Sequence, residues 1–460
     1  MFSSWAIGHI LLILSYSLAL FGVAHMLRQR RSPGATCAWL LLFVTAPYFG
    51  AILYLMIGGR KLKRDQRERI VARFSDEETV SSASATDHET MLRRCGVPGA
   101  TGKNLVTLCP TGYAGFQALT KLIDSADRTL CVGTFIFNND ETGRDILDRL
   151  VERAKAGVEV RLLVDGVGSL WTPQRVFQPL VDAGGEFAFF KPAIHVPFRS
   201  RTNLRNHRKI AVADSRLAFA GGMNISVDGL VSRPDQPCWH DLALTVEGPA
   251  AEHLESVFLS DWEFETGNRV AVGTTASTDA NGNSMVQVLA SGPDVEFDPM
   301  YASTLASVHS ARKRVWFVTP YFVPNDALQE ALVFACRRGI DVRVLVPKKS
   351  NHRLTDLASM SFLREIQSAG GTVLRYPNRM VHAKAMIVDD QFASVGSANM
   401  DMRSLFLNYE VMLVTYSAID IQNVANWFET LAGVCLQEIE PPGFWQLIGE
   451  GMIRVASPLF

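Results

Sequence analysis

The chain has 460 residues and a formal net charge of −1 at pH 7, so two or three domains are expected. The balanced charge argues against capture of nucleic acid by bulk positive potential. Its seven cysteines are scattered without a C-x-x-C pair, which gives no zinc site and suits reduced thiols in a reducing compartment.

Two long apolar stretches lie at the start of the chain. Trp5 to Leu27 and Ala35 to Ile57 each contain 23 residues without Asp, Glu, Lys or Arg. As helices they would each measure about 35 Å, enough to cross a bilayer. A signal peptide and two buried globular helices are the alternatives, but no Lys or Arg precedes Trp5. We predict a transmembrane helical hairpin over residues 1–60, in which Pro47 kinks the second span.

A basic cluster follows the second stretch. Residues 60–69 contain six Lys and Arg, and the loop between the two stretches carries three Arg. Because positive charge is enriched on the cytoplasmic flank of membrane helices, the larger cluster predicts a cytoplasmic catalytic part. Residues 75–89 are polar and rich in Ser and Thr. We therefore predict a basic juxtamembrane segment and linker over residues 61–104.

The rest of the chain contains the same pattern twice. Residues 130–137, 142–155 and 158–164 predict a strand, a helix and a second strand, and residues 315–322, 327–338 and 340–346 repeat that order. The phrases GVEVRLLVD and GIDVRVLVP occupy the same place in the two halves. We predict an α/β fold of two duplicated lobes, 105–273 and 284–460, each with a mixed sheet flanked by helices and separated by a polar linker.

A His-x-Lys-x4-Asp motif occurs once in each half, at His207, Lys209 and Asp214 and again 175 residues later at His382, Lys384 and Asp389. In each copy an Asn follows the His by 17 residues, at Asn224 and Asn399. Chance does not repeat such an array, so the motifs predict one shared site at a pseudo-twofold seam between the lobes.

The spacing of the motif predicts how its side chains are placed. Residues i and i+2 of a strand share a face, so His and Lys of each copy should point the same way. We count both Asp residues among the candidate catalytic residues because they complete the motif. Each falls in a turn after the strand, where fixing the turn is the more natural role.

Two imidazoles, two ammonium groups and two amides suit substitution at a phosphodiester. One imidazole can attack phosphorus and form a phosphohistidine, while the other protonates the leaving alkoxide and then deprotonates the acceptor. The lysines and asparagines can hold the non-bridging oxygens as negative charge spreads over them. This chemistry requires no metal or other cofactor, and the sequence offers no carboxylate cluster for a metal.

These features resemble the phospholipase D superfamily and, within it, the bacterial cardiolipin synthases with two motifs. The resemblance covers nearly the whole chain and includes NHRKIAV, GGMN, TPYFVPND, HAKAMIVDD and GSANMDMRSLFLNYE. It implies a phosphatidyltransferase that moves a phosphatidyl group between two phosphatidylglycerol molecules and releases glycerol. It further implies a multi-pass protein of the bacterial inner membrane that works on anionic phospholipid and has no nucleic-acid partner. Neither the resemblance nor the residues give an oligomeric state.

The family also implies that a downstream carboxylate orients each imidazole. Glu410 matches that position in the second half and Asp241 in the first, where WHD replaces the usual WRD. The resemblance favours His207 as the nucleophile and His382 as the acid and base, while the residues alone leave the choice open. The alternatives are a phospholipase D that uses water, a synthase with phosphatidylethanolamine as donor, a nucleic-acid phosphodiesterase and a membrane protein that only binds.

Overall fold

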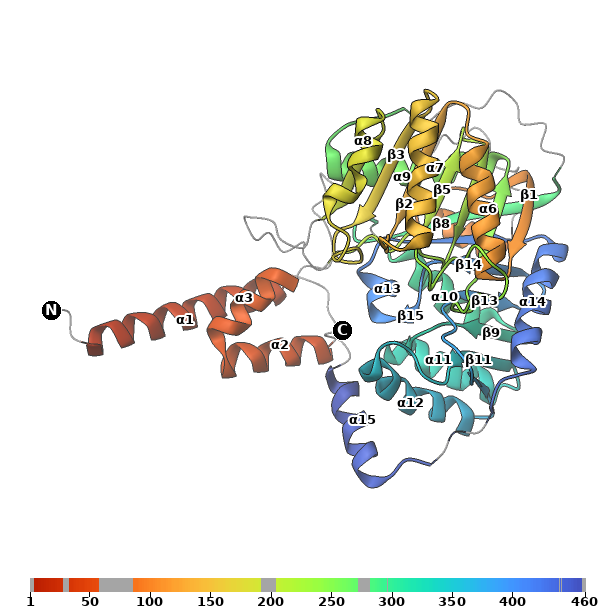
Figure 1. Ribbon diagram of the computed structural model, residues 1–460. Helices are drawn as coiled ribbons and strands as arrows, with labels where there is room; N and C mark the ends of the chain where they lie inside the picture. The colour runs from red at the N-terminus through yellow and green to blue at the C-terminus, as the bar shows by residue number, and fades with distance from the viewer. Residues whose placement is uncertain are drawn as a thin grey trace.

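The structure is a computed structural model that describes residues 4–27, 33–57, 86–191, 204–271, 282–295, 297–437, 439 and 441–456. Figure 1 shows two α/β lobes packed against each other and a group of N-terminal helices that projects from them. The predicted basic cluster at 60–69 and residues 274–281 of the predicted linker at 274–283 lie outside the described residues.

One sheet of 14 strands runs through both lobes. Lobe one supplies β1 (Thr101–Cys109), β2 (Thr129–Thr134), β3 (Glu159–Asp165), β4 (Glu186–Phe190), β5 (Ile210–Ala213), β6 (Leu217–Gly221) and β7 (Ala243–Glu247). Lobe two supplies β8 (Ser284–Ser291), β9 (Arg314–Val318), β11 (Asp341–Pro347), β12 (Thr372–Tyr376), β13 (Ala385–Val388), β14 (Phe392–Gly396) and β16 (Glu410–Thr415). A separate parallel pair is formed by β10 (Phe322–Val323) and β15 (Met400–Asp401).

The strand order repeats between the lobes. From its outer edge to the centre, lobe two runs β12-β11-β9-β13-β14-β16-β8, and lobe one runs β4-β3-β2-β5-β6-β7-β1. The outer three strands of each lobe are parallel, and β1 and β8 meet antiparallel at the centre. The predicted mixed sheet is thus confirmed, and the two halves of the sheet are related by a pseudo-twofold axis.

Helices cover both faces of the sheet (Figure 1). Lobe one has α6 (Gly112–Asp124), α7 (Glu141–Lys155), a 3-10 turn (Gln174–Phe177), α8 (Gln178–Asp182) and α9 (Pro249–Thr266). Lobe two has α10 (Pro299–Ser310), α11 (Asp326–Arg337), α12 (Arg353–Ser368), α13 (Met402–Phe406), α14 (Ala418–Ala432) and α15 (Phe444–Ala456). Side-chain caps fix the starts of the crossover helices, as at Asp140 for α7 and Asn325 for α11. The crossover helices α7 and α11 begin at the same edge of the sheet as the site described below.

The N-terminal helices are α1 (Ser4–Leu27), α2 (Pro33–Thr45) and α3 (Pro47–Ile57). The second predicted stretch is interrupted at Pro47, where the sequence predicts a kink, because α2 ends directly before Ala46 and Pro47 begins α3. An aromatic cluster holds the helices together: Tyr54 stacks edge-on against Trp39 and Phe43. None of the helices in the described part of the chain is long and apolar enough to cross a membrane. The predicted transmembrane hairpin is therefore not confirmed.

A helix that the sequence did not predict lies inside the proposed linker. α5 (Asp87–Arg94) packs on lobe two, where Nε2 of His88 lies 2.8 Å from Oγ of Ser303 and its ring stacks on Phe392. Strand β1 then begins at Thr101 rather than near residue 105. The predicted linker at 61–104 is thus wrong for residues 86–104, which belong to the folded body.

Candidate active site at the seam between the lobes

The two motif histidines lie just before β5 and β13, which begin at Ile210 and Ala385. The predicted strand at His207 starts three residues later because the preceding residues pair with the other lobe. The backbone N–H of His207 donates to the carbonyl oxygen of Tyr409, at 2.9 Å, and that of His382 donates to the carbonyl oxygen of His240, at 2.7 Å. Each motif is therefore held by backbone from the opposite lobe.

The imidazoles are paired with carboxylates in the same crossed manner. Nδ1 of His207 lies 3.0 Å from Oε2 of Glu410, and Nδ1 of His382 lies 2.7 Å from Oδ2 of Asp241. All four side chains are buried. Because an ionised carboxylate only accepts hydrogen bonds, each Nδ1 carries the proton and each Nε2 is left as the basic nitrogen. The crossed pairs make the site incomplete in either lobe alone.

The carboxylates occupy equivalent sheet positions. The register pairs Gly221 with Ala243 and Gly396 with Met412, so Asp241 and Glu410 each lie two residues before an equivalent position. The residue after each glycine then differs. A Cβ atom at Gly222 would lie 2.1 Å from Oδ1 of Asp241, so only glycine fits there. In lobe two Ser397 takes that place and donates its hydroxyl to Glu410, at 2.5 Å.

The motif lysines and asparagines surround the two histidines. Nζ of Lys384 lies 3.0 Å from both ring nitrogens of His382, and Nζ of Lys209 donates to the carbonyl oxygen of His207 at 2.7 Å. Oδ1 of Asn224 accepts the backbone N–H of Ile136 at 3.2 Å, which leaves its NH₂ group to donate elsewhere.

Asn399 is also buried, and its carbonyl oxygen has no hydrogen-bond partner among the described residues. Its amide instead hydrogen-bonds Asp401. The seam thus offers two imidazoles, two ammonium groups and two amides, as the motifs predict. No group of three or more His, Cys, Asp or Glu side chains suited to a metal is found in the part of the chain that the structure describes.

Burial sets the charge state of the site. It lowers the pKa of His207 to about 4, against the opposing attraction of Glu410, and the pKa of His382 to about 3, with further lowering by Lys384. Burial also lowers the pKa of Lys209 to about 7, aided by repulsion from Lys384, whose own pKa falls to about 8. Both imidazoles are therefore neutral at neutral pH.

The pKa values of the two carboxylates are lowered, although burial alone would raise them. Burial alone would raise the pKa of Asp241, but the charge and hydrogen bond of His382 lower it overall. Glu410 behaves in the same way through His207 and Lys209. Both groups stay ionised, so each can stabilise an imidazolium that forms during a reaction.

The aspartates that complete the motifs lie outside this cluster. Asp214 follows β5 and accepts the backbone N–H groups of residues 127, 128 and 129 at 2.7–2.9 Å. Asp389 follows β13 and accepts those of residues 312, 313 and 314 at 2.7–2.9 Å. Because a strand of four residues, about 13 Å, separates each Asp from the motif lysine, the contacts favour the turn-fixing role over a catalytic one. Both fix the turn before a neighbouring strand.

Several residues of the site were not singled out by the sequence. An aromatic ring lies against each imidazole, Phe135 against His207 at 4.9 Å and Trp239 against His382 at 5.0 Å. Tyr409 and His240, which hold the motif backbones, directly precede Glu410 and Asp241. Their shared position, directly before each orienting carboxylate, is the sequence feature by which they could have been found.

The arginines near His207 do not all face the site. Arg208 is buried in an ion pair with Asp261 at 2.6 Å and does not face the site. Arg205 donates to the carbonyl oxygen of Lys191 at 2.8 Å, and Arg199 and Arg201 lie outside the described residues.

Comparisons with known proteins agree with this architecture. The family described as "Cardiolipin synthase, PLD-like domain" matches residues 119–262 and 305–432, and that described as "Phospholipase_D-nuclease N-terminal" matches residues 17–59. The chain is 32% identical to cardiolipin synthase 1 of Bacillus cereus over 96% of this chain and 93% of that protein. It is 30% identical to the major cardiolipin synthase ClsA of Bacillus subtilis over 99% of this chain and 100% of that protein.

Among solved structures, phosphatidylserine synthase of Haemophilus influenzae shares the fold with a TM-score of 0.60 at 15% identity, over 81% of this chain and 100% of that chain. The family match includes both motif-bearing lobes, and the relatives span nearly the whole length. The protein belongs to the phospholipase D-like cardiolipin synthase family.

Proposed function

We propose that the protein is a cardiolipin synthase that transfers a phosphatidyl group between two phosphatidylglycerol molecules and releases glycerol. The observation that carries this proposal is the crossed pair of neutral imidazoles, each tied through Nδ1 to a buried carboxylate of the other lobe. Such a pair supplies one nucleophile and one acid-base group to a single phosphorus atom.

In the first half-reaction Nε2 of His207 attacks the phosphorus of one phosphatidylglycerol. The bond from phosphorus to the glycerol oxygen breaks, and His382 gives that oxygen a proton. Lys209 and Lys384, with the amide of Asn224, balance the charge on the non-bridging oxygens. The bound phosphodiester draws the ammonium of Lys384 away from the His382 ring, which allows that ring to hold the proton that it delivers.

In the second half-reaction the neutral His382 accepts a proton from a hydroxyl of the second phosphatidylglycerol. The freed oxygen attacks phosphorus, the N–P bond of the phosphohistidine breaks, and cardiolipin forms. Glu410 stabilises the positive charge that His207 carries in the intermediate, as Asp241 does for His382. The roles of the two histidines follow the family resemblance, and the chemistry balances equally with the roles exchanged.

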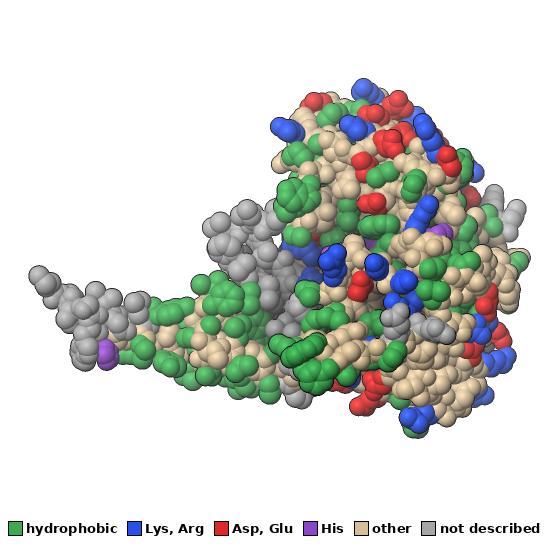
Figure 2. All heavy atoms as spheres, turned by 60° about the horizontal axis from the view of Figure 1, so that its bottom comes forward, with side chains coloured by type: hydrophobic (Ala, Val, Ile, Leu, Met, Phe, Trp, Pro, Cys, Tyr) green, Lys and Arg blue, Asp and Glu red, His purple; other side chains and the backbone are tan. Residues whose placement is uncertain are grey.

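We further propose that α1–α3 attach the enzyme to an anionic phospholipid membrane. Figure 2 shows a projection whose surface is largely hydrophobic, and Leu20, Phe21 and Phe49 are 73%, 72% and 61% exposed. Large exposed apolar surfaces mark sites of membrane or protein interaction. We place the enzyme at the bacterial inner membrane with its lobes on the cytoplasmic side, a placement supported by the basic cluster at residues 60–69.

The activity is tested by incubating the purified full-length chain with phosphatidylglycerol alone and analysing the lipids by mass spectrometry. Cardiolipin and glycerol in equal amounts are expected. Phosphatidic acid and glycerol would instead indicate a phospholipase D that uses water. Cardiolipin that forms only when phosphatidylethanolamine is added would indicate a different donor.

Attachment is tested separately by vesicle flotation of the full chain and of the Leu20→Glu, Phe21→Glu variant. The variant should float less than the native chain while it keeps activity on a soluble phosphodiester. Equal flotation of both proteins would contradict attachment through this surface.

A further inference from the structure

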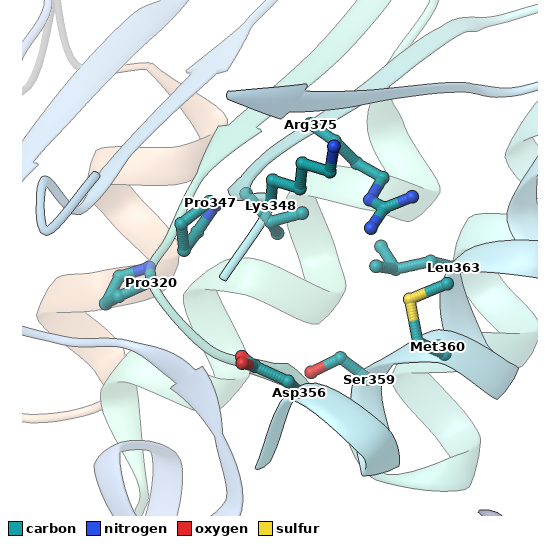
Figure 3. A pocket seen from close by; sticks show the side chains of 9 residues that line it. Pro320, Pro347, Lys348, Asp356, Ser359, Met360, Leu363 and Arg375 are labelled. Atoms are coloured by element: carbon teal, nitrogen blue, oxygen red, sulfur yellow. The ribbon is translucent and has the colours of Figure 1, made fainter. Parts of the chain in front are cut away.

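A pocket with two cationic side chains lies on lobe two. One side is formed by Pro347, Lys348 and Arg375 at the carboxyl ends of β11 and β12, and the other by Ser359, Met360 and Leu363 of α12 (Figure 3). The hollow holds about 20 Å³, which is room for about one water-sized group, and it opens to solvent. It therefore suits a small charged group bound at the surface rather than an acyl chain.

The charges of this pocket favour an anion. Neither Lys348 nor Arg375 has an ion-pair partner within the described ranges. The carboxylate of the pocket belongs to Asp356, which accepts the backbone N–H of Ser350 at 3.0 Å and so holds the loop after β11. Two cations beside a hydroxyl-bearing helix face form the kind of site that binds a phosphodiester.

The sheet register relates the pocket to the twin-histidine site. The paired strands place Leu374, Leu345, Val318 and Ala385 in one row. The next row, on the opposite face, contains Arg375, Val346 and Lys384, so Arg375 and Lys384 share a face. Lys348 follows Val346 by two residues, and His382 precedes Lys384 by two residues. Because β11 and β13 run in opposite directions, both steps lead toward the same edge of the sheet. Lys348 directly follows β11 and His382 precedes β13, and these strands lie two strand spacings apart in the sheet, about 10 Å.

That separation matches the chemistry of the second substrate. The acceptor phosphatidylglycerol keeps its own phosphodiester, whose phosphorus is five bonds from the attacking hydroxyl oxygen, about 6 Å away. While that hydroxyl attacks at the histidines, the second phosphate must lie one glycerol length to the side. Resting on the proposed function, we propose that Lys348 and Arg375 bind the phosphodiester of the acceptor lipid and so favour transfer over hydrolysis.

The duplicated lobes differ at this point. In lobe one Phe189 pairs with Val164 as Arg375 pairs with Val346, and Gly166 corresponds to Lys348. Phe189 packs edge-on against Phe187 at 4.9 Å, so lobe one has an aromatic cluster where lobe two has cations. Only lobe two carries the charged pair, as expected if the two lipids bind in different roles at one pseudo-symmetric site.

Two assays on the full-length chain separate the acceptor from the donor. Exchange of radiolabelled glycerol into phosphatidylglycerol uses the first half-reaction and its reverse, with no second lipid. Cardiolipin formation from phosphatidylglycerol vesicles needs the acceptor phosphate as well. Lys348→Ala and Arg375→Ala should each lower cardiolipin formation about 10- to 100-fold, since each removes a charge-assisted hydrogen bond. Glycerol exchange should stay within about 2-fold of the native rate, and the share of phosphatidic acid should rise.

Matched controls remove the same charges elsewhere. Lys155 at the end of α7 and Arg337 at the end of α11 are exposed and lie at the opposite edge of the sheet. Lys155→Ala and Arg337→Ala should leave both assays unchanged, and Arg375→Lys should restore part of the cardiolipin formed. Equal loss of exchange and of cardiolipin in the pocket variants, or no loss of either, would overturn the acceptor site. A native chain that exchanges glycerol but makes no cardiolipin would overturn the proposed function itself.

Discussion

Nδ1 of His207 lies 3.0 Å from Oε2 of Glu410, although the two residues belong to different lobes. The same crossing joins His382 to Asp241 at 2.7 Å. Each catalytic imidazole is therefore positioned by a strand of the opposite repeat. This gives a physical reason for the duplication to remain in one chain, since separation of the lobes would leave four buried polar groups without partners.

The crossed pairs predict which step each carboxylate supports. Glu410→Gln should impair adduct formation at His207, even with a nitrophenyl phosphodiester whose leaving group needs little protonation. Asp241→Asn should act through His382 and so spare that substrate, while it slows the reaction of phosphatidylglycerol. We expect losses of about 10²- to 10⁴-fold in the affected step, because the amide misorients the imidazole and fails to stabilise its cation.

The measurement is burst-phase release of nitrophenol compared with steady-state cardiolipin formation for each variant. A Glu410→Gln enzyme with a normal burst and an Asp241→Asn enzyme without one would show that the pairs work within each lobe, or that the roles of the histidines are exchanged. Thermal unfolding of both variants controls for loss of fold.

Much of this fold follows from patterns that act over short distances. The strand at β3, the helix at α7 and their copies in lobe two were predicted because apolar periodicity and the glycine after each helix are local signals. The repeated motif then indicated one shared seam. The interruption at Pro47 was predicted for the same reason, because proline disfavours a continuous helix. By contrast, α5 is a short polar helix whose apolar partner, lobe two, lies far along the chain.

The candidate site was predictable as a set of residues but not as a set of contacts. Glu410 and Asp241 could be found through the family resemblance, while their pairing with the opposite histidine is decided by how the lobes dock. The motif aspartates show the reverse case. Their spacing suggested the site, but their carboxylates accept three backbone N–H groups each at the far end of the strand.

The turn role of Asp389 predicts an effect on stability rather than on chemistry. Asp389→Ala should lower the free energy of unfolding by about 2–4 kcal/mol, because three part-buried backbone N–H groups lose a charged acceptor. The neighbouring Asp390, which forms an exposed ion pair with Lys313, offers a matched control. Asp390→Ala should change stability little, since exposed pairs contribute little. Chemical denaturation checks both variants, and a folded Asp389→Ala enzyme that is inactive but fully stable would contradict the structural role.

The charge state of the site predicts the pH dependence of kcat/KM, which reports groups of the free enzyme. As pH falls through the pKa of about 4, His207 gains a proton and the nucleophile is lost. As pH rises through about 7 and 8, Lys209 and Lys384 lose the protons that attract the phosphodiester. We therefore expect a maximum at mildly acidic pH.

In the pH profile of kcat, the fall in rate on the alkaline side should occur at higher pH than in kcat/KM, because the bound phosphodiester stabilises both ammonium groups. The profile is best measured with a soluble nitrophenyl phosphodiester, which keeps the charge of the lipid surface out of the result. A kcat/KM that stays constant from pH 6 to pH 9 would contradict the lowered pKa values of the lysines.

The covalent intermediate gives the last prediction. Quenching the enzyme and radiolabelled phosphatidylglycerol in alkaline denaturant, in which the N–P bond survives, should trap the labelled phosphoryl group on His207, because its Nε2 is unprotonated while Nδ1 donates to Glu410. His207→Ala should abolish the label. His382→Ala should retain it with a nitrophenyl substrate, since the leaving group then needs no proton, although both changes should cost several orders of magnitude in cardiolipin formation. Peptide mapping that finds the label on His382 would reverse the roles. A native enzyme without label under any quench condition would point to direct displacement by the acceptor.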